Sequence, residues 1–448
     1  MAGRISTPQR SRRLSVSRPE VDGSAIFYSY FTGTTPILLL RCLYALCHRL
    51  LWKRSIGLAL LALAAVASPS QTAHRATADF QALADQAQQA SQQNRLDDAV
   101  GLYRKALALK PAWTEGWWSL GTIEYDRDNY AKAARAFERL IALDAKNGTA
   151  HAMLGLCQYE LGKDEPALQN FLAAERLGIL KDESLRRVAV YHLGLLELRL
   201  GKFSVATETL VQLAKDGVRS KELNTALGLA ALLMRPQEAP ADGTEGARVV
   251  EQAGEAEALL GAKDFEGSKA LYASLSKAYP GYPNLHFAFG RLLLETHDAD
   301  QAVEEFQLEL KRDPQNVNSM LEIAAVRYRT DSADGVKYAE EAVRLDPRRP
   351  FGHYLLGLLY LDTQNPVGAI SELEVAKRAH PELAEIYLAL GNAYARAGRK
   401  QEAAQARATF KRLNSENAGQ QTDDVYGGQP SGLVRGKIQA EPEAKPPN

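Results

Sequence analysis

The sequence repeats itself with a period of about 34 residues over most of its length. The segment LGTIEYDRDNYAKAARAFERLIALDAKN at 120–147 returns as LGLCQYELGKDEPALQNFLAAERLG at 154–178, and further copies begin at residues 193, 356 and 390. Each copy of this length is one small unit that cannot bury its apolar face alone, so neighbouring copies must stack. The period therefore predicts a repeat array.

Each copy has the pattern of two helices. Apolar residues fall at helical spacing, small residues recur at positions 8, 20 and 27 where paired helices can approach closely, and proline stops many second helices. Counting the first residue of each pair as position 1, the pairs start at residues 80, 114, 148, 187, 221, 249, 283, 317, 350 and 384.

This pattern resembles the tetratricopeptide repeat family, whose units carry Trp, Leu-Gly, Tyr, Ala, Phe or Tyr, Ala and Pro at positions 4, 7–8, 11, 20, 24, 27 and 32. The resemblance runs from residue 78 to about 414 and implies an all-α, right-handed superhelical solenoid of helix-turn-helix repeats. The residues that carry it are Ala99, Tyr103, Ala106 and Pro111, then Trp117, Leu120, Gly121, Ala133 and Phe137, and later Leu356, Gly357, Tyr360, Ala369, Ala376 and Pro381.

The repeat phase breaks after ALGLAALLM, where RPQEAPADGTEG stands in place of a second helix. Two prolines and two glycines in this stretch indicate a loop. We therefore expect two blocks of repeats, at 78–234 and 247–414, joined by a linker at 235–246 that few contacts cross. The polar, Gly- and Pro-rich segment 415–448 is predicted to be a disordered tail.

Residues 1–67 have the features of an N-terminal leader. Within them, KRSIGLALLALAAVA at 53–67 has a basic start, a short apolar run and small residues at its end, as in a signal peptide cleaved near Ala67. Three interpretations of residues 1–52 stay open: the true start lies downstream, the leader is long, or the segment remains as a membrane anchor. We expect a bacterial protein that is periplasmic or secreted, or else anchored by its N-terminus.

Charge and cysteine content exclude some classes of protein. The chain has 54 basic and 54 acidic residues, but the excess of basic residues lies in the first 54, so the repeats are mildly acidic. Nucleic-acid binding needs a basic face and is not expected. Of the three cysteines, Cys42 and Cys47 precede the repeats, so the repeats hold only Cys157 and cannot form a disulfide framework within the chain. Cys157 is interpreted as a small core residue.

No catalytic or metal-binding motif is present. The sequence lacks HExxH, paired CxxC, GxSxG and a phosphate-binding loop, so we expect no enzyme, no metal and no cofactor. His151, His286 and His353 share position 4 of their repeats and are interpreted as packed, hydrogen-bonded histidines. Glu304 and Glu305 are interpreted as part of a solvated helix face.

The family resemblance implies that the first helix of each pair lines a concave groove with positions 2, 5, 9 and 12. Trp117, at position 4, is then expected in the core, and its neighbour at position 5 in the groove. Tyrosine at positions 5 and 12 is also common in idealised repeats, so part of this set is family background. The aromatic residues expected to line the groove and bind a partner are Trp118, Tyr125, Tyr159, Tyr191, Phe287, Tyr328 and Tyr354.

An aromatic and aliphatic groove suits an extended peptide or a helix with apolar side chains. The sequence thus predicts a non-enzymatic scaffold for protein–protein interaction in the cell envelope. The alternative is a targeting or regulatory subunit of an envelope enzyme or assembly machine, which would contact that machine through the tail or the N-terminus.

Overall fold

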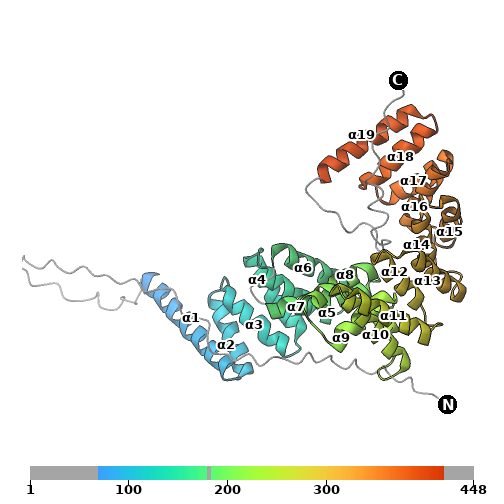
Figure 1. Ribbon diagram of the computed structural model, residues 1–448. Coiled ribbons are helices and arrows are strands. Elements are labelled where there is room, and N and C mark those ends of the chain that lie inside the picture. The colour runs from blue at the N-terminus through green and yellow to red at the C-terminus, as the bar shows by residue number, and fades with distance from the viewer. Residues whose placement is uncertain (1–68, 179–182, 418–448) are drawn as a thin grey trace, which may run out of the picture. The chain divides into compact units, whose positions relative to one another are not determined.

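The computed structural model describes residues 69–178 and 183–417. These residues form nineteen α-helices, one short 3₁₀ helix and no β-strand (Figure 1). The predicted leader at 1–67 lies outside the described residues, as does the tail beyond residue 417. The α-helices are α1 Pro69–Gln92, α2 Leu96–Leu109, α3 Thr114–Asp126, α4 Tyr130–Leu143, α5 Gly148–Glu160, α6 Asp164–Leu177, α7 Glu183–Arg199, α8 Phe203–Lys215, α9 Lys221–Ala231, α10 Glu245–Gly261, α11 Phe265–Ala278, α12 Leu285–Glu295, α13 Ala299–Arg312, α14 Val317–Arg327, α15 Ser332–Leu345, α16 Pro350–Asp362, α17 Pro366–Ala379, α18 Ala384–Arg396 and α19 Lys400–Asn417.

The helix pairs of the repeats, among the described residues from Phe80 onward, belong to one compact unit. There, successive helices pack in pairs, such as α3 with α4 and α16 with α17, and each pair also packs on the next. The predicted all-α array of stacked helix pairs is confirmed. None of the described helices is long and apolar enough to cross a membrane.

The glycine at position 8 lets the two helices of a pair come close together. A Cβ atom added to Gly121 of α3 would lie 2.8 Å from the ring of Phe137 in α4, and one added to Gly290 of α12 would lie 2.5 Å from the ring of Phe306 in α13. Both phenylalanine side chains are completely buried. The Leu-Gly signature of the sequence therefore marks the place where an aromatic ring of the second helix packs against the backbone of the first.

The helix that seemed to be missing after α9 is replaced by α10. The intervening segment holds only the 3₁₀ helix Pro236–Glu238, but α10 packs against α9 as well as against α11. At their crossing, a Cβ atom on Gly228 of α9 would lie 1.8 Å from the carbonyl oxygen of Val250, and one on Gly254 of α10 would lie 1.6 Å from that of Asn224. The two backbones touch because both positions are glycine.

The expectation that few contacts cross the 235–246 segment is therefore wrong. One hydrophobic cluster runs without interruption from Leu198, through α9 and α10, to Ile323. Its members include Leu227 and Val249, each completely buried on its own side of the segment. The loop composition predicted the loop correctly, but packing across a loop depends on the helices that flank it. The two-block division remains a prediction.

Candidate functional site

Four of the predicted aromatic residues are half-buried on three successive first helices. Trp118 and Tyr125 belong to α3, Tyr159 to α5 and Tyr191 to α7. We call these four residues the aromatic face. Their repeat positions, 5 and 12, place them on corresponding sides of helices that stack on one another. Their role in binding a partner stays a prediction.

Neighbouring side chains hold the aromatic face in place. The ring of Trp118 meets Phe137 of α4 edge to face, with 5.6 Å between ring centroids. The guanidinium of Arg199 lies 4.2 Å from the centre of the Tyr159 ring and also pairs with Asp164 at 2.7 Å. These contacts restrict the orientations that the rings of Trp118 and Tyr159 can take.

The tyrosine hydroxyls of the aromatic face lie in poorly hydrated surroundings. Burial, followed by the charge of Glu160, raises the pKa of Tyr125 above its ordinary value, and burial likewise raises the pKa of Tyr191. His192 lies between the rings of Tyr159 and Tyr191, and burial lowers its pKa. At neutral pH this surface therefore presents neutral hydroxyls and a neutral imidazole beside the cation of Arg199.

Trp117 and Trp118 differ less in burial than the sequence suggested. Both are half-buried, and Trp117 contacts two separate hydrophobic clusters. Its indole Nε1 donates a hydrogen bond to the carbonyl of Pro111 at 2.8 Å. Trp117 thus links its helix to the end of the preceding pair, whereas Trp118 packs against one cluster only and on the ring of Phe137 in its own pair.

Three predicted groove residues are in fact buried. Phe287, Tyr328 and Tyr354 are only 4 %, 6 % and 4 % exposed. Phe287 packs on Phe306, with ring centroids 6.0 Å apart. α14 ends at Arg327, so Tyr328 lies beyond the helix, and α16 is apolar on every side, which favours burial of the whole helix. In this structure these three side chains do not form an exposed surface.

A buried group of charged residues in α10, α12 and α14 was not predicted. Glu257 and Glu322 are 8 % and 5 % exposed, and burial raises the pKa of each to about 7. The cation of Arg291 opposes both shifts, and the hydroxyl of Tyr272 donates a hydrogen bond to Glu257 at 2.7 Å. Glu257 and Arg291 occupy position 9, but sequence position alone does not reveal that their surroundings are closed.

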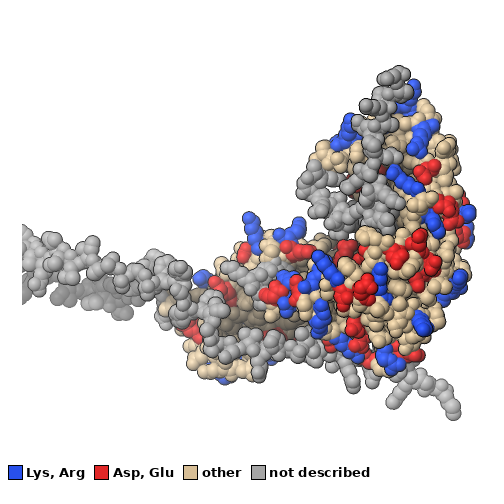
Figure 2. Space-filling model, in the orientation of Figure 1, with Lys and Arg blue, Asp and Glu red and all other residues tan. Residues whose placement is uncertain are grey.

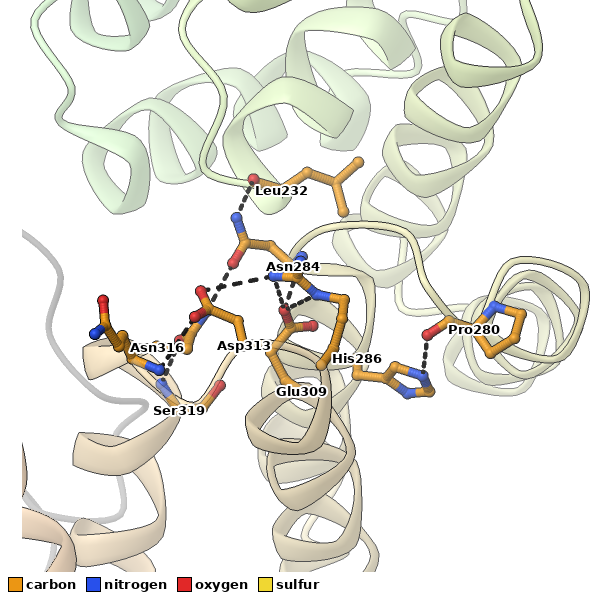
Figure 3. A network of polar contacts seen from close by, with 10 residues as sticks. Leu232, Pro280, Asn284, His286, Glu309, Asp313, Asn316 and Ser319 are labelled. Atoms are coloured by element: carbon orange, nitrogen blue, oxygen red, sulfur yellow. Dashed lines mark hydrogen bonds and ion pairs between the residues drawn. The ribbon is translucent and has the colours of Figure 1, made fainter.

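Polar contacts also join the end of α9 to the start of α12 (Figure 3). Asn284, which has a left-handed backbone with φ of 58°, donates its side-chain amide to the carbonyl of Leu232 at 3.0 Å. Its backbone N–H donates to the completely buried Glu309 at 3.1 Å, and Asn316 donates to its side-chain oxygen at 3.0 Å. These contacts stabilise the junction that follows the irregular segment.

The three histidines at position 4 are hydrogen-bonded, as the sequence predicted, and the acidic partners of two of them were not predicted. His286 and His353 are each 6 % exposed and hydrogen-bonded, and His151 contacts Asn170 at 2.8 Å. However, Glu305 is no solvated acid, because it contacts His286 at 2.6 Å. Cys157 is completely buried as predicted, and burial raises the pKa of its thiol to about 12.

The surface carries charges of both signs close together. On the face shown in Figure 2, Lys and Arg side chains alternate with Asp and Glu over the described helices, without a large patch of one sign. Among the described residues, no group of three or more His, Cys, Asp or Glu side chains is placed to hold a metal ion.

Comparison with known proteins agrees with the repeat pattern. Segments 84–145, 119–179, 254–317 and 325–384 match the family model for the tetratricopeptide repeat. Comparison with curated proteins gives no match.

Several solved structures are similar to parts of the chain. MamA is 19 % identical, with a TM-score of 0.35 over 36 % of this chain and 96 % of MamA. Yeast Tom70 is 18 % identical, with a TM-score of 0.31 over 75 % of this chain and 69 % of Tom70. The Cut9–Hcn1 hetero-tetramer of APC/C is 12 % identical, with a TM-score of 0.32 over 76 % of this chain and 88 % of that one. With its matched segments and its stacked helix pairs, the chain belongs to the tetratricopeptide repeat family.

Proposed function

We propose that this protein is a non-enzymatic scaffold that binds an extended peptide or a helix of another protein against the aromatic face. Tetratricopeptide repeat proteins in general are protein-interaction scaffolds. The observation that carries the proposal is the recurrence of aromatic side chains that are only half-buried on α3, α5 and α7. Large aromatic residues of this kind supply most of the binding energy at protein interfaces.

The chemistry of the aromatic face favours apolar partners. Trp118 offers a broad ring, and Tyr125 and Tyr191, which are half-buried, each offer a ring and a hydroxyl. A partner that buries apolar side chains on the rings while its main-chain carbonyls accept hydrogen bonds from these hydroxyls would match this surface.

A catalytic role is less well supported. The acids with the most perturbed pKa values, Glu257 and Glu322, are enclosed between helices rather than placed on an accessible surface. Perturbed groups also occur in structural networks, and the bond from Tyr272 to Glu257 is of that kind. We therefore propose no reaction for this protein.

The second candidate is a targeting or regulatory subunit of an envelope enzyme or assembly machine. In that case the partner would contact the leader at 1–67 or the tail at 415–448, and the aromatic face would serve only the packing of the repeats. The composition of the tail, which is polar and rich in Gly and Pro, favours this alternative.

Site-specific photo-crosslinking separates the two candidates. A photoreactive phenylalanine analogue is placed at Trp118, at Tyr191, at Tyr426 in the tail, and at Arg139, an exposed position on α4, as the matched control. Crosslinks to the same protein from Trp118 and Tyr191, but not from Arg139, support the scaffold. Crosslinks from Tyr426 alone support the regulatory subunit.

We also propose that the chain is exported and that cleavage occurs near Ala67. The support is the order of a basic start, an apolar run and small residues at 53–67. Cell fractionation with N-terminal sequencing tests this. A mature chain that begins near Ser68 outside the cytoplasm agrees with the proposal, whereas an uncleaved chain in the membrane fraction supports the anchor. An uncleaved cytosolic chain contradicts both.

A further inference from the structure

One hydrogen bond recurs between consecutive repeats and does not depend on a single residue type. The side chain at position 4 donates to the carbonyl of a proline six residues earlier. Trp117 donates to Pro111 at 2.8 Å, and Tyr387 donates to Pro381 at 2.9 Å. An indole N–H and a phenol O–H both donate a hydrogen bond in their neutral form.

Histidine occupies the same place in two other repeats. His286 Nε2 lies 3.2 Å from the carbonyl of Pro280, and His353 Nε2 lies 2.9 Å from that of Pro347. Figure 3 shows the first of these pairs. Unlike tryptophan and tyrosine, histidine gains and loses a proton in the physiological range.

The other ring nitrogen of each histidine also faces an acceptor. His286 Nδ1 lies 2.6 Å from Glu305 of α13, and His353 Nδ1 lies 2.6 Å from Glu372 of α17. Carbonyl and carboxylate oxygens only accept hydrogen bonds, and a neutral imidazole carries a single N–H. Only the doubly protonated ring can satisfy both acceptors at once.

We propose that His286 and His353 make the helices α12–α13 and α16–α17 a pH-sensitive part of the array, which loosens as rising pH removes the second ring proton. Each ring is only 6 % exposed, so water cannot easily replace the lost N–H. Deprotonation therefore leaves either the carboxylate or the proline carbonyl without its ring donor. The charge-assisted bond from the first helix to Glu305 or Glu372 of the second, or the bond back to the preceding proline, is then lost, and the helix pair is held less firmly.

The charges around the two rings agree with this direction. The bond to Glu305, opposed by burial and helped by Glu309, raises the pKa of His286. The bond to Glu372 raises the pKa of His353, although burial and Arg378 of α17 oppose it. A histidine whose pKa is raised on folding contributes stability that is complete below the unfolded value, about 6.5, and is lost as pH rises through the folded value.

Two other groups respond to pH in a separate range. Burial raises the pKa values of Glu257 and Glu322 from the ordinary 4.5 to about 7 in the folded protein. Their contribution to the stability of the fold is lost between about pH 4.5 and 7. This is mostly below the pH range in which the two histidines lose their second proton. In α7 the effect of pH on stability has the opposite direction, because burial lowers the pKa of His192. The loss of stability above about pH 7 should thus be confined to the two histidine units.

Hydrogen–deuterium exchange of the full chain, followed by mass spectrometry from pH 5.5 to 8.5, tests the proposal. Rates are divided by those of an unstructured chain at each pH. We expect the protection of α12–α13 and α16–α17 to fall several-fold above pH 6.5, while that of α3–α4, where Trp117 is the donor, stays constant. Equal pH profiles in all these helices would overturn the proposal.

The double variant Glu305→Gln, Glu372→Gln keeps an acceptor at each Nδ1 but removes its charge. We expect its protection to depend much less on pH, whereas Glu304→Gln, at an exposed neighbouring position of α13, should behave like the unmodified protein. Unchanged pH dependence in the double variant would contradict the role of the carboxylates. Hydrogen exchange at the C2 atom of histidine, followed in the unmodified protein, measures the pKa of each ring and needs no variant. The pKa values of His286 and His353 should both lie above that of free histidine. Values at or below that of free histidine would overturn the proposal.

Discussion

At the scale of single residues, Trp117 and Trp118 show how neighbours on one helix take different roles. Trp117 contacts two hydrophobic clusters and donates to Pro111, whereas Trp118 packs edge to face on Phe137. We expect Trp117→Ala to lower the free energy of unfolding by about 3 kcal/mol or more, since it removes packing and a hydrogen bond. Trp118→Ala should cost about 1 kcal/mol, because less of its packing is lost. Urea melts of both variants provide the measurement, and equal losses would show that both residues are core.

Repeat position predicted only in part which aromatic residues are accessible. The numbering that placed Trp118 and Tyr191 on an accessible side also placed Tyr328 and Tyr354 there, and these two are buried. The difference arises from neighbours rather than from position: α14 ends one residue before Tyr328, and α16 is surrounded by apolar contacts. Burial of Glu257 and Glu322 escaped prediction for the same reason, since an acidic residue on a helix is usually solvated.

At the scale of helices, the crossing of α9 and α10 is the closest approach of two backbones described above. We expect Gly228→Ala to destabilise the protein by about 3 kcal/mol or more, because its Cβ would lie 1.8 Å from the carbonyl oxygen of Val250 and the helices would have to separate. The matched control is Gly101→Ala on α2, where an added Cβ meets nothing within 4 Å. This substitution should stabilise the protein by about 0.5–1 kcal/mol, because alanine favours a helix more than glycine does. Thermal melts of both variants test this, and a neutral Gly228→Ala would mean that the crossing is looser than described.

Helix pairs were predictable because their signals are local. The Leu-Gly, alanine and proline positions repeat with a fixed spacing, and each marks a contact within one pair or with the next. Pairing across 235–246 was not predicted, because no fixed spacing links α9 to α10. Gly228 at position 8 did carry the signal of a close helix neighbour, but the loop that follows gave no sign that α10 would fill that place.

At the scale of the whole repeat array, the 235–246 segment should be a site of cleavage but not of separation. Residues 241–245 are exposed, so limited proteolysis should cut there early. We expect the fragments on either side to remain associated in size-exclusion chromatography, because α9 and α10 share one buried cluster. Fragments that separate without denaturant would instead support two independent blocks.

The central claim is that the aromatic face binds a protein partner, and affinity measured on matched variants tests it most directly. The partner captured by crosslinking is titrated by calorimetry against the unmodified protein, the double variant Trp118→Ala, Tyr191→Ala, and the control Arg139→Ala on the exposed side of α4. We predict that the double variant binds about 30-fold or more weakly, which corresponds to the loss of about 2 kcal/mol at an interface hot spot, and that the control binds normally. The same Kd for all three folded proteins would contradict the claim.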